Sequence, residues 1–450
     1  MTYATINPYT NELVKQFDFD SYPDLETSRK ALKCWKKLSV LERGIQLQRV
    51  SDLLKKNADS YARLITLEMG KPLREAQYEI AKSITAFDYY IEHAPSFLAD
   101  KKMDTPAYKS FIAHEPLGII FSIMPWNFPF WQVFRFAVPT LIAGNVTILK
   151  HAPNVPQCAL AIRQLFDEAG VESGVFSNYF LTNEDAARLI AEPDVAGISF
   201  TGSDATGSYL ASLAGKHIKK SVMELGGNDA FIVLEDADLD AAVAGAIKSR
   251  GINTGQACNG AKRFIVQQRI ASAFTEKLTR EVLQLKVGNP METDTQAGPL
   301  ARRDLADKVR AQISKTVAEG AAIVANDLPE NSSPNFVSPT VLTGVTQNMT
   351  SANEEIFGPV WSVMVVDSLE EAVELANSSQ YGLAASIWTG DLKKAEEAAR
   401  MLETGNVFIN DIVKSDPRMP FGGVKRSGYG RELSEAGLME FVNVKTIYIK

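Results

Sequence analysis

From Gly118 onward the chain alternates short apolar runs with longer amphipathic segments. A first series of runs reads GIIFSIMP, NVTILK, GVFSNYF and VAGISF, and a second series reads AFIVL, FIVQ and VFIN. Short runs without a polar face are typical of parallel strands that helices cover on both sides. The pattern therefore predicts two α/β domains in tandem, and the cleft between them is the expected place for chemistry.

The length and the flanking segments agree with this organisation. A chain of 450 residues is too long for one ordinary core. Residues 28–97 carry apolar side chains at helical spacing, as at Leu47, Val50 and Leu54. Segments 108–115 and 442–450 are typical of β extensions. They are either ordinary edge strands or, because a long exposed edge must be covered, part of a subunit interface.

Composition argues against several classes of partner. The formal charge is −7 and no basic block stands out, so we expect no nucleic acid. The most apolar stretch, residues 134–149, is broken by Pro139 and Gly144 well short of a membrane span, so we expect no membrane. The four histidines have no metal-ligand spacing, and we expect no metal site.

Two features favour a cytoplasmic protein. The first 15 residues lack the basic start and apolar stretch of a secretory signal. The three cysteines, at positions 34, 158 and 258, are far apart and form no CxxC pair, which is not the pattern of a disulfide framework.

One of these cysteines, Cys258, lies in the segment NTGQACNGAKRF. A free cysteine that merely packs in a core is the usual case. The residues around Cys258 are polar or small, however, and Lys262 and Arg263 supply positive charge that would favour a thiolate. Gly255 and Gly260 would let the backbone approach a bound group closely. These features make Cys258 a candidate nucleophile.

Two further polar residues stand in unusual surroundings. Glu224, between apolar residues in SVMELGGNDAFIVL, is either a paired structural charge or a general base whose pKa is raised by partial burial. Asn127, between the prolines of MPWNFPFWQ, is either a turn residue or a donor to a developing oxyanion. In FTGSDATG, Gly202 and Ser203 precede an expected helix start, which favours phosphate but is a weak signal alone.

Five motifs occur together in this chain: PWNFP, MELGG, GQACNGAKR, EEIFGPV and PFGGVKRSGYGRE. With INPYTNE near the start, they resemble the aldehyde dehydrogenase superfamily over essentially the whole chain. The resemblance implies a Rossmann-like NAD(P)-binding domain (residues 1–99 and 117–226) and an α/β catalytic domain (residues 227–430). It also implies a small β oligomerisation extension (residues 100–116 and 431–450) and a homodimer or homotetramer.

The same resemblance implies roles for three catalytic residues. Cys258 looks like the nucleophile that forms a thiohemiacetal with an aldehyde and, after hydride transfer to nicotinamide, a thioester. The Asn127 side chain and the Cys258 backbone N–H look like the oxyanion hole. Glu224 resembles the base that activates water for deacylation. Relatives that pass the acyl group to coenzyme A generally lack this glutamate, so the implied product is a free carboxylic acid.

The resemblance also implies a set of cofactor contacts. The residues assigned to the cofactor are Trp126, Lys150, Gly202, Ser203, Glu355 and Phe357. Lys150 matches a lysine that contacts the adenosine ribose, and many NAD-preferring relatives have a glutamate three residues later. Here that position is Pro153, so no carboxylate repels a 2′-phosphate. We expect use of NAD or NADP, with the preference left open.

Arg135 stands among apolar residues in FPFWQVFRFAVP. An isolated buried cation is costly, so Arg135 either pairs with an internal carboxylate or offers its planar fork to a substrate carboxylate. Its position resembles that of the carboxylate-binding arginine in compact bacterial-type succinate-semialdehyde dehydrogenases. Segment 413–423 resembles the loop that closes their substrate pocket, with Ser415 as a second donor.

The implied reaction is the oxidation of succinate semialdehyde to succinate. Glutarate semialdehyde, or a broad range of aliphatic aldehydes, is the alternative, because Phe128, Trp131 and Phe421 would form an aromatic lining. A non-catalytic binding or structural relative of the fold is the alternative of another class.

Overall fold

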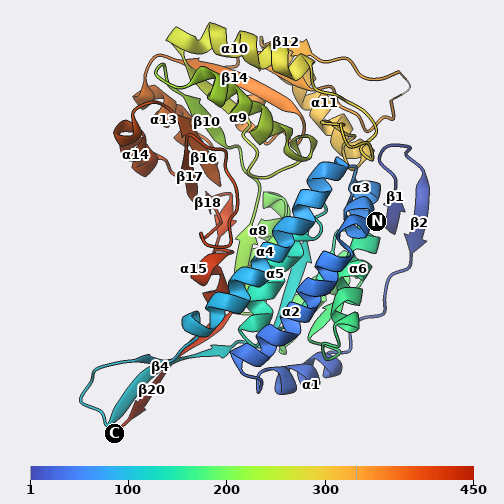
Figure 1. The fold of residues 1–450 in the computed structure, drawn as a ribbon, viewed down its shortest axis with the longest axis vertical. Helices are drawn as coiled ribbons and strands as arrows, with labels where there is room; N and C mark the ends of the chain where they lie inside the picture. Colours follow the sequence, from blue (N-terminus) through green and yellow to red (C-terminus); the bar gives the residue numbers. More distant parts are fainter. Residues whose placement is uncertain (1, 331) are drawn as a thin grey trace.

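Two α/β units and a projecting β extension make up the computed structural model, which describes residues 2–330 and 332–450 (Figure 1). The predicted ranges of the two domains include Met1 and Asn331, which lie outside the described residues. The α/β class predicted from the apolar runs is confirmed. None of the helices in the described ranges is long and apolar enough to cross a membrane.

The first unit is built on a six-stranded sheet with the order β19-β9-β8-β5-β6-β7. Its strands are β5 (Ile119–Met124), β6 (Val146–His151), β7 (Phe176–Asn178), β8 (Val195–Thr201), β9 (Lys220–Glu224) and β19 (Gly428–Tyr429). The first five pair in parallel, and β19 is antiparallel to β9. Strand β6 is buried at every position, as expected for a strand covered on both faces.

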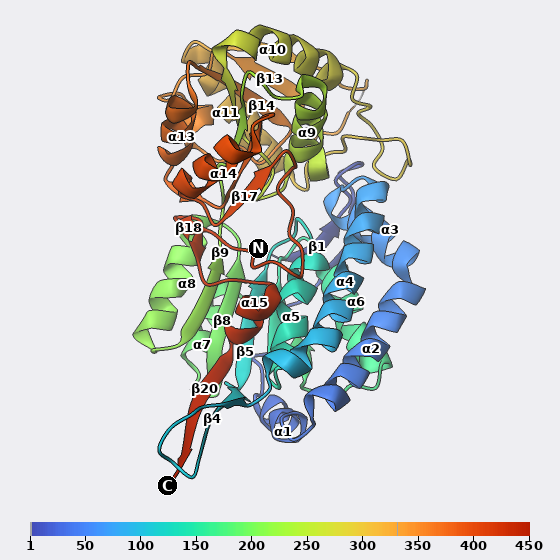
Figure 2. The same ribbon diagram turned by 60° about the vertical axis from the view of Figure 1, so that its left-hand side comes forward.

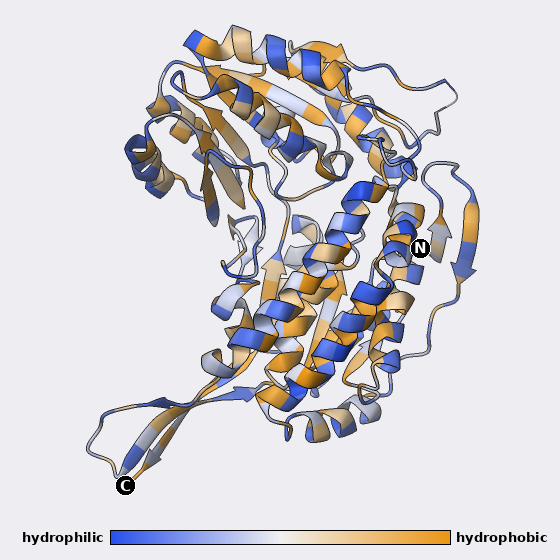
Figure 3. Cartoon of the chain, viewed as in Figure 1, coloured by the Kyte–Doolittle hydropathy of each residue, from blue (hydrophilic) through white to orange (hydrophobic). Residues whose placement is uncertain are grey.

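Helices cover both faces of this sheet, with α7 and α8 on one side and α4, α5 and α6 on the other (Figure 2). The helices of the unit are α1 (Glu26–Trp35), α2 (Val40–Lys56), α3 (Ala58–Met69), α4 (Leu73–Phe97), α5 (Trp131–Ile142), α6 (Pro156–Glu168), α7 (Asn183–Ala191) and α8 (Asp204–Lys216). Their apolar sides face the sheet and one another, and polar residues cover the outer sides (Figure 3). The helical pattern predicted for residues 28–97 is confirmed by α1 to α4.

The second unit contains a seven-stranded sheet with the order β12-β13-β14-β11-β10-β16-β17. Its strands are β10 (Ala230–Val233), β11 (Arg263–Gln267), β12 (Ala322–Ala325), β13 (Thr340–Thr343), β14 (Val360–Val366), β16 (Ala384–Trp388) and β17 (Asn406–Ile409). All pairs are parallel except β12 with β13. The accompanying helices are α9 (Leu239–Gly251), α10 (Gln268–Leu283), α11 (Arg303–Ala318), α12 (Thr350–Asn353), α13 (Leu369–Asn377) and α14 (Leu392–Met401).

The two predicted β extensions pair with each other. Strand β20 (Val442–Ile449) is antiparallel to β4 (Lys109–Pro116), whose other edge pairs with the short β3 (Lys101–Lys102). This ribbon projects away from both units and carries the C-terminus (Figure 1). Val444 and Tyr448 are more than half exposed on β20. The remaining short elements are β1 (Tyr3–Ile6), β2 (Leu13–Phe17), β15 (Tyr381–Gly382), β18 (Val424–Lys425) and α15 (Ser434–Met439).

The site is positioned by the way the two sheets face each other. Strands β5, β8 and β9 end side by side, since Ile123 pairs with Phe200 and Thr201 pairs with Glu224. The loops that follow these carboxyl ends point toward the second unit. In the second unit, the segments that precede β11 and β14 lie opposite these loops and line the same cleft. The carboxyl edge of one sheet therefore meets the amino edge of the other, and a cleft lies between them.

Candidate active site

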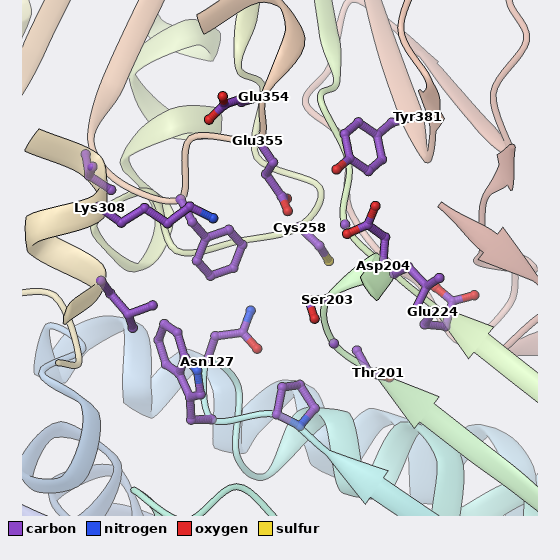
Figure 4. A pocket seen from close by; sticks show the side chains of 18 of the residues that line it. Asn127, Thr201, Ser203, Asp204, Glu224, Cys258, Lys308, Glu354, Glu355 and Tyr381 are labelled. Carbon is purple, nitrogen blue, oxygen red and sulfur yellow. The ribbon is translucent and has the colours of Figure 1, made fainter. Parts of the chain in front are cut away.

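A cleft of roughly 440 Å³ lies between the two units, and Cys258, Asn127 and Glu224 line it from different elements (Figure 4). Asn127 follows β5, Glu224 is the last residue of β9, and Cys258 precedes β11. The cleft is also lined by five of the six residues assigned to the cofactor: Trp126, Gly202, Ser203, Glu355 and Phe357. Among residues 2–330 and 332–450, no group of His, Cys, Asp or Glu side chains could hold a metal ion.

The segment before Cys258 has an unusual backbone conformation. After the short 3-10 helix Ile252–Gly255 begins, Asn253 and Thr254 both adopt a left-handed φ of 52°. Such a φ is unfavourable for a β-branched residue and persists only when surrounding contacts enforce it. Here the Asn253 N–H donates to the Glu75 carboxylate, and Thr254 Oγ1 accepts from Gly298 N at 2.9 Å. These contacts fix the direction in which the chain enters Cys258.

Gly255 is required for a different reason from the one expected. Its φ is +78°, and a Cβ there would lie 2.1 Å from the carbonyl oxygen of Gly358. The close approach is thus to the EEIFGPV loop of the same unit rather than to a bound group. Gly260 likewise faces protein, since its nearest neighbour would be the Ser249 carbonyl oxygen at 3.1 Å.

Arg250, at the end of α9, joins the two loops and was missed by the sequence analysis. Its buried guanidinium donates to the carbonyls of Gly358 (2.9 Å) and Ile356 (2.8 Å), and also to that of Gly255. Burial lowers the pKa of Arg250 to about 10, so the group stays charged at neutral pH. Nothing in the segment KSRG distinguishes it from a helix-terminal surface arginine, because its partners are all backbone oxygens.

Asn127 is held rigidly by two hydrogen bonds to the Cys258 loop. Its Nδ2 donates to the Gln256 carbonyl at 3.0 Å, and its own backbone carbonyl accepts from Asn253 Nδ2 at 2.8 Å. An amide nitrogen has two hydrogens, so one remains to donate into the cleft. The side chain is 5% exposed, points into the cleft and comes from the opposite unit to Cys258 (Figure 4).

Lys262 organises the Cys258 loop and Glu355 together. Its ammonium donates to the Ala257 carbonyl at 3.1 Å and to the Cys258 carbonyl, and it pairs with Glu355 Oε1 at 3.3 Å. Glu355 also accepts from Gly227 N at 3.1 Å. A Cβ on Gly226 would lie 2.4 Å from Glu355 Oε2, so this glycine makes room for the carboxylate.

The thiol of Cys258 is protonated at neutral pH, because burial outweighs the positive charge that was expected to favour a thiolate. Burial raises its pKa to about 11, although Arg135 and Lys262 oppose that rise. Arg263 contributes differently from the sequence-based expectation, because its guanidinium donates to the backbone carbonyls of Asn228, Leu375 and Ala376. The positive charge close to the sulfur comes from Lys262 and from Arg135, which is distant in sequence.

The predicted rise in the pKa of Glu224 is confirmed, and its cause is stronger than partial burial. Glu224 is 3% exposed, and burial followed by repulsion from Glu432 holds its pKa well above the usual range. Among the described residues, its Oε1 has no hydrogen-bond partner. A Cβ on Gly422 would lie 2.6 Å from this oxygen, so Gly422 leaves space beside it. A buried carboxyl group with a raised pKa is suited to accept a proton near neutral pH.

Arg135 pairs with an internal carboxylate, which is one of the two possibilities left open by the sequence. Its guanidinium, 2% exposed on α5, forms an ion pair with Glu432 and lies 5.2 Å from the centroid of the Phe421 ring. Arg135 lowers the pKa of both Glu224 and Cys258. It is not among the residues that line the cleft, and its predicted contact with a substrate carboxylate remains a prediction.

The residues assigned to the cofactor occupy two places. Trp126 and Phe357 meet edge to face across the cleft, with ring centroids 5.9 Å apart. Ser203 caps α8, whose first backbone N–H groups face the cleft beside Gly202. Lys150 lies elsewhere, buried near the end of β6 with its ammonium 5.7 Å from the Tyr3 ring. Burial lowers its pKa to about 8.

A cluster of aromatic side chains adjoins Cys258, and its role as a substrate lining remains a prediction. Phe128, Trp131 and Phe421 pack in one apolar cluster with Cys258 and Val413. At this cluster, Ser415 Oγ accepts a hydrogen bond of 2.7 Å from the ammonium of Lys82, which lies 4.5 Å from the Trp131 ring centroid. Lys82 was missed by the sequence analysis.

Lys82 belongs to one polar face of α4. Glu75, Glu79 and Lys82 are spaced by four and three residues, so they lie on the same side of the helix. Glu79 pairs with the buried Lys71 and accepts the N–H groups of Phe130 and Trp131, at 2.8 and 3.1 Å. The signal that could have revealed this face was its charged residues inside an otherwise buried helical stripe.

Residues 1–447 match the aldehyde dehydrogenase family. The chain belongs to this family. It is 45% identical over the full length of both chains to a probable succinate-semialdehyde dehydrogenase [NADP(+)] of Synechocystis sp.. It is 42% identical to the succinate semialdehyde dehydrogenase [NAD(P)+] of Escherichia coli, over 99% of this chain and 97% of that one.

A solved aldehyde dehydrogenase structure has nearly the same fold. The succinic semialdehyde dehydrogenase from Streptococcus pyogenes, in complex with NADP+, is 39% identical and superimposes with a TM-score of 0.95 over 99% of each chain. The α/β fold predicted from the sequence and the family resemblance are thus both confirmed.

The charges around Glu224 predict opposite effects of two substitutions on this aldehyde dehydrogenase. A general base must be ionised, so kcat should rise with pH through the pKa of Glu224. Arg135→Met removes a charge that lowers this pKa, and Glu432→Gln removes one that raises it. In a pH profile of kcat, the rising limb should move to higher pH in the first variant and to lower pH in the second, by about one pH unit each.

Two controls accompany this measurement. Arg135→Lys keeps the positive charge, so the rising limb of its kcat profile should stay near the wild-type pH. Arg418→Met removes an exposed cation that pairs with Asp416 and should not move it. Shifts of the same sign in Arg135→Met and Glu432→Gln would refute the electrostatic account of Glu224.

Proposed function

We propose that this chain oxidises succinate semialdehyde to succinate, with NADP+ as hydride acceptor and NAD+ as a second acceptor. The observation that carries the proposal is the meeting of Cys258, Asn127 and Glu224 in one cleft, with an aromatic cluster packed beside Cys258. The full-length relatives from Synechocystis and Escherichia coli, which are named as succinate-semialdehyde dehydrogenases for NADP+ or for both cofactors, support the choice of substrate and cofactor.

Acylation begins with the Cys258 sulfur. After the thiol releases its proton to solvent, the thiolate attacks the aldehyde carbon and forms a thiohemiacetal, and the carbonyl oxygen becomes an oxyanion. The free Nδ2 hydrogen of Asn127 and the backbone N–H of Cys258 donate to this oxyanion. Loss of a hydride from the thiohemiacetal carbon then leaves the thioester. Arg135 and Lys262 favour the thiolate, because both lower the pKa of the buried thiol.

Deacylation requires a base and a water molecule. Water attacks the thioester carbonyl while the Glu224 carboxylate accepts one of its protons. The carbon–sulfur bond then breaks, so a carboxylic acid leaves and the Cys258 sulfur is regenerated. Glu224 is suited to this role because burial and repulsion from Glu432 raise its pKa, which makes its carboxylate a stronger base than that of an exposed glutamate.

The cleft has the shape and donors that a dinucleotide needs. The N–H groups at the start of α8 are suited to the pyrophosphate, and Glu355 with Phe357 and Trp126 would hold the nicotinamide end. A Cβ at Gly202 would lie 2.4 Å from the Phe200 ring, so no larger side chain blocks the approach to α8. When bound, NADP+ or NAD+ supplies the acceptor for the aldehyde hydride. Pro153 offers no carboxylate against a 2′-phosphate.

The test of this proposal is kcat/KM for succinate semialdehyde against butanal, each with NADP+ and NAD+. Butanal has the same chain length and lacks the carboxylate. We expect the semialdehyde to be preferred at least about 10-fold, since charge-assisted hydrogen bonds discriminate by that order. Similar values would indicate a general aliphatic aldehyde dehydrogenase, and a preference for glutarate semialdehyde would change the substrate. No turnover with any aldehyde would favour a non-catalytic relative.

We further propose that the chain acts as a homodimer or homotetramer in the cytoplasm. The apolar side chains of Val444 and Tyr448 are exposed on the free edge of β20, which favours pairing with another copy. All three cysteines are free, in keeping with a reducing compartment. The domain ranges inferred from the family resemblance belong to the same proposal.

Sedimentation velocity tests the assembly. The double variant Val444→Lys/Tyr448→Lys should shift the protein toward the monomer, because it places charges on the exposed edge. Ile218→Lys, which changes an exposed apolar residue away from the ribbon, is the matched control. A wild-type monomer, or a double variant with the wild-type assembly, would contradict the role of β20.

A further inference from the structure

Lys82 is a half-buried cation without an acidic partner. Within the described residues, no carboxylate forms an ion pair with its ammonium, whereas Lys71 and Arg135 nearby are paired with Glu79 and Glu432. The ammonium donates one hydrogen bond, to Ser415 Oγ at 2.7 Å, and has two further hydrogens. Removing a cation from water without an anion is unfavourable, so this position is suited to an anionic ligand.

Ser415 adds another donor at the same point. Its hydroxyl oxygen accepts the hydrogen bond from Lys82, which leaves its own hydrogen free to be donated. The residue is 8% exposed and follows Val413, which packs in the apolar cluster with Cys258. The hydrogens that Lys82 and Ser415 leave unused are all hydrogen-bond donors at one point. A carboxylate, which has only acceptor atoms, would therefore be a matching ligand.

The walls between this donor pair and the nucleophile are apolar. Trp131 contacts Lys82 through its ring and belongs to the cluster that contains Phe128, Phe421 and Cys258. A substrate with its aldehyde at Cys258 and an anionic group at Lys82 would therefore place its methylene groups against aromatic rings. This is the arrangement that a short ω-carboxy aldehyde requires.

We infer that Lys82, together with Ser415, is the residue that binds the distal carboxylate of the substrate and determines specificity for it. The inference rests on the proposed function and names a residue of the substrate pocket that the family resemblance did not indicate. Arg135 already has a carboxylate partner in Glu432, whereas Lys82 has none among the described residues, so Lys82 adds a second cation beside the aromatic cluster.

The charges that face Lys82 come from five segments, including Lys71, which precedes α4 and also lowers the pKa of Lys82. Glu79 lies on its own helix, Arg135 on α5, Cys258 on the loop before β11, and Asp416 next to Ser415. Burial and then Arg135 lower the pKa of Lys82 to about 7, although Glu79 and Cys258 oppose this. Asp416 is engaged by Arg418 and does not pair with Lys82. Lys82 is therefore charged at pH 6 and largely neutral at pH 9.

The test compares kcat/KM for succinate semialdehyde and butanal in Lys82→Met. The ratio of the two should fall about 10- to 100-fold, through a higher KM for the semialdehyde, since one charge-assisted anchor is lost. Lys82→Arg should recover part of the ratio, and Ser415→Ala should lower it less than Lys82→Met. Arg74→Met removes an exposed cation from the same helix and should keep the wild-type ratio. Inhibition of butanal oxidation by succinate, a readout that does not depend on turnover of the semialdehyde, should also weaken in Lys82→Met.

The pH dependence gives an independent readout. In the wild type, the semialdehyde-to-butanal ratio should fall as pH rises from 6 to 9, because Lys82 loses its charge while effects of Glu224 and Cys258 cancel between substrates. This dependence should disappear in Lys82→Met. A wild-type preference that survives unchanged in Lys82→Met would overturn the role of Lys82 and leave the proposed function standing. A wild type without any preference would instead overturn the proposed function.

Discussion

The active site depends on the buried guanidinium of Arg250. It donates to carbonyls of the segment before Cys258 and of the EEIFGPV loop, so the nucleophile and the Glu355–Phe357 wall form one rigid body. Left-handed conformations at Asn253 and Thr254 are tolerated because neighbouring residues bond that segment on its other side. A charged group whose partners are all backbone oxygens is costly to remove, since each carbonyl would lose its donor in a buried setting.

The chemistry is distributed over both units, and buried charges adjust it. Glu224 and Glu432 repel each other, Arg135 opposes that repulsion, and the net result is a carboxyl group with a raised pKa beside a neutral thiol. The α4 face adds a second set of charges, which holds the loop of Asn127 and the start of α5 in place. The same helix thus supports the oxyanion donor and contributes a cation to the substrate pocket.

Much of this organisation could be predicted from the sequence. The apolar runs indicated parallel strands, and the motifs indicated Cys258, Glu224, Asn127 and the cofactor cleft, because local spacing and family pattern carry those signals. Arg250 could not be found in this way, since its role arises from contacts with residues far along the chain. The charged stripe of α4 could have drawn attention to Lys82, but its contact with Ser415 could not be predicted from the sequence. The protonated state of Cys258 could not be predicted for a related reason. Adjacent positive charge is visible in a sequence, whereas the burial that outweighs it is not.

The central claim is that Cys258 carries the acyl group and that Glu224 removes it by activating water. Peptide mass spectrometry of Glu224→Gln, quenched after addition of succinate semialdehyde and NADP+, tests this most directly. The account predicts a succinyl group on the Cys258 peptide of the variant that accumulates over time, and little or none in the wild type. An unmodified Cys258 in the variant, or a succinyl group on Cys34 or Cys158 instead, would contradict the account.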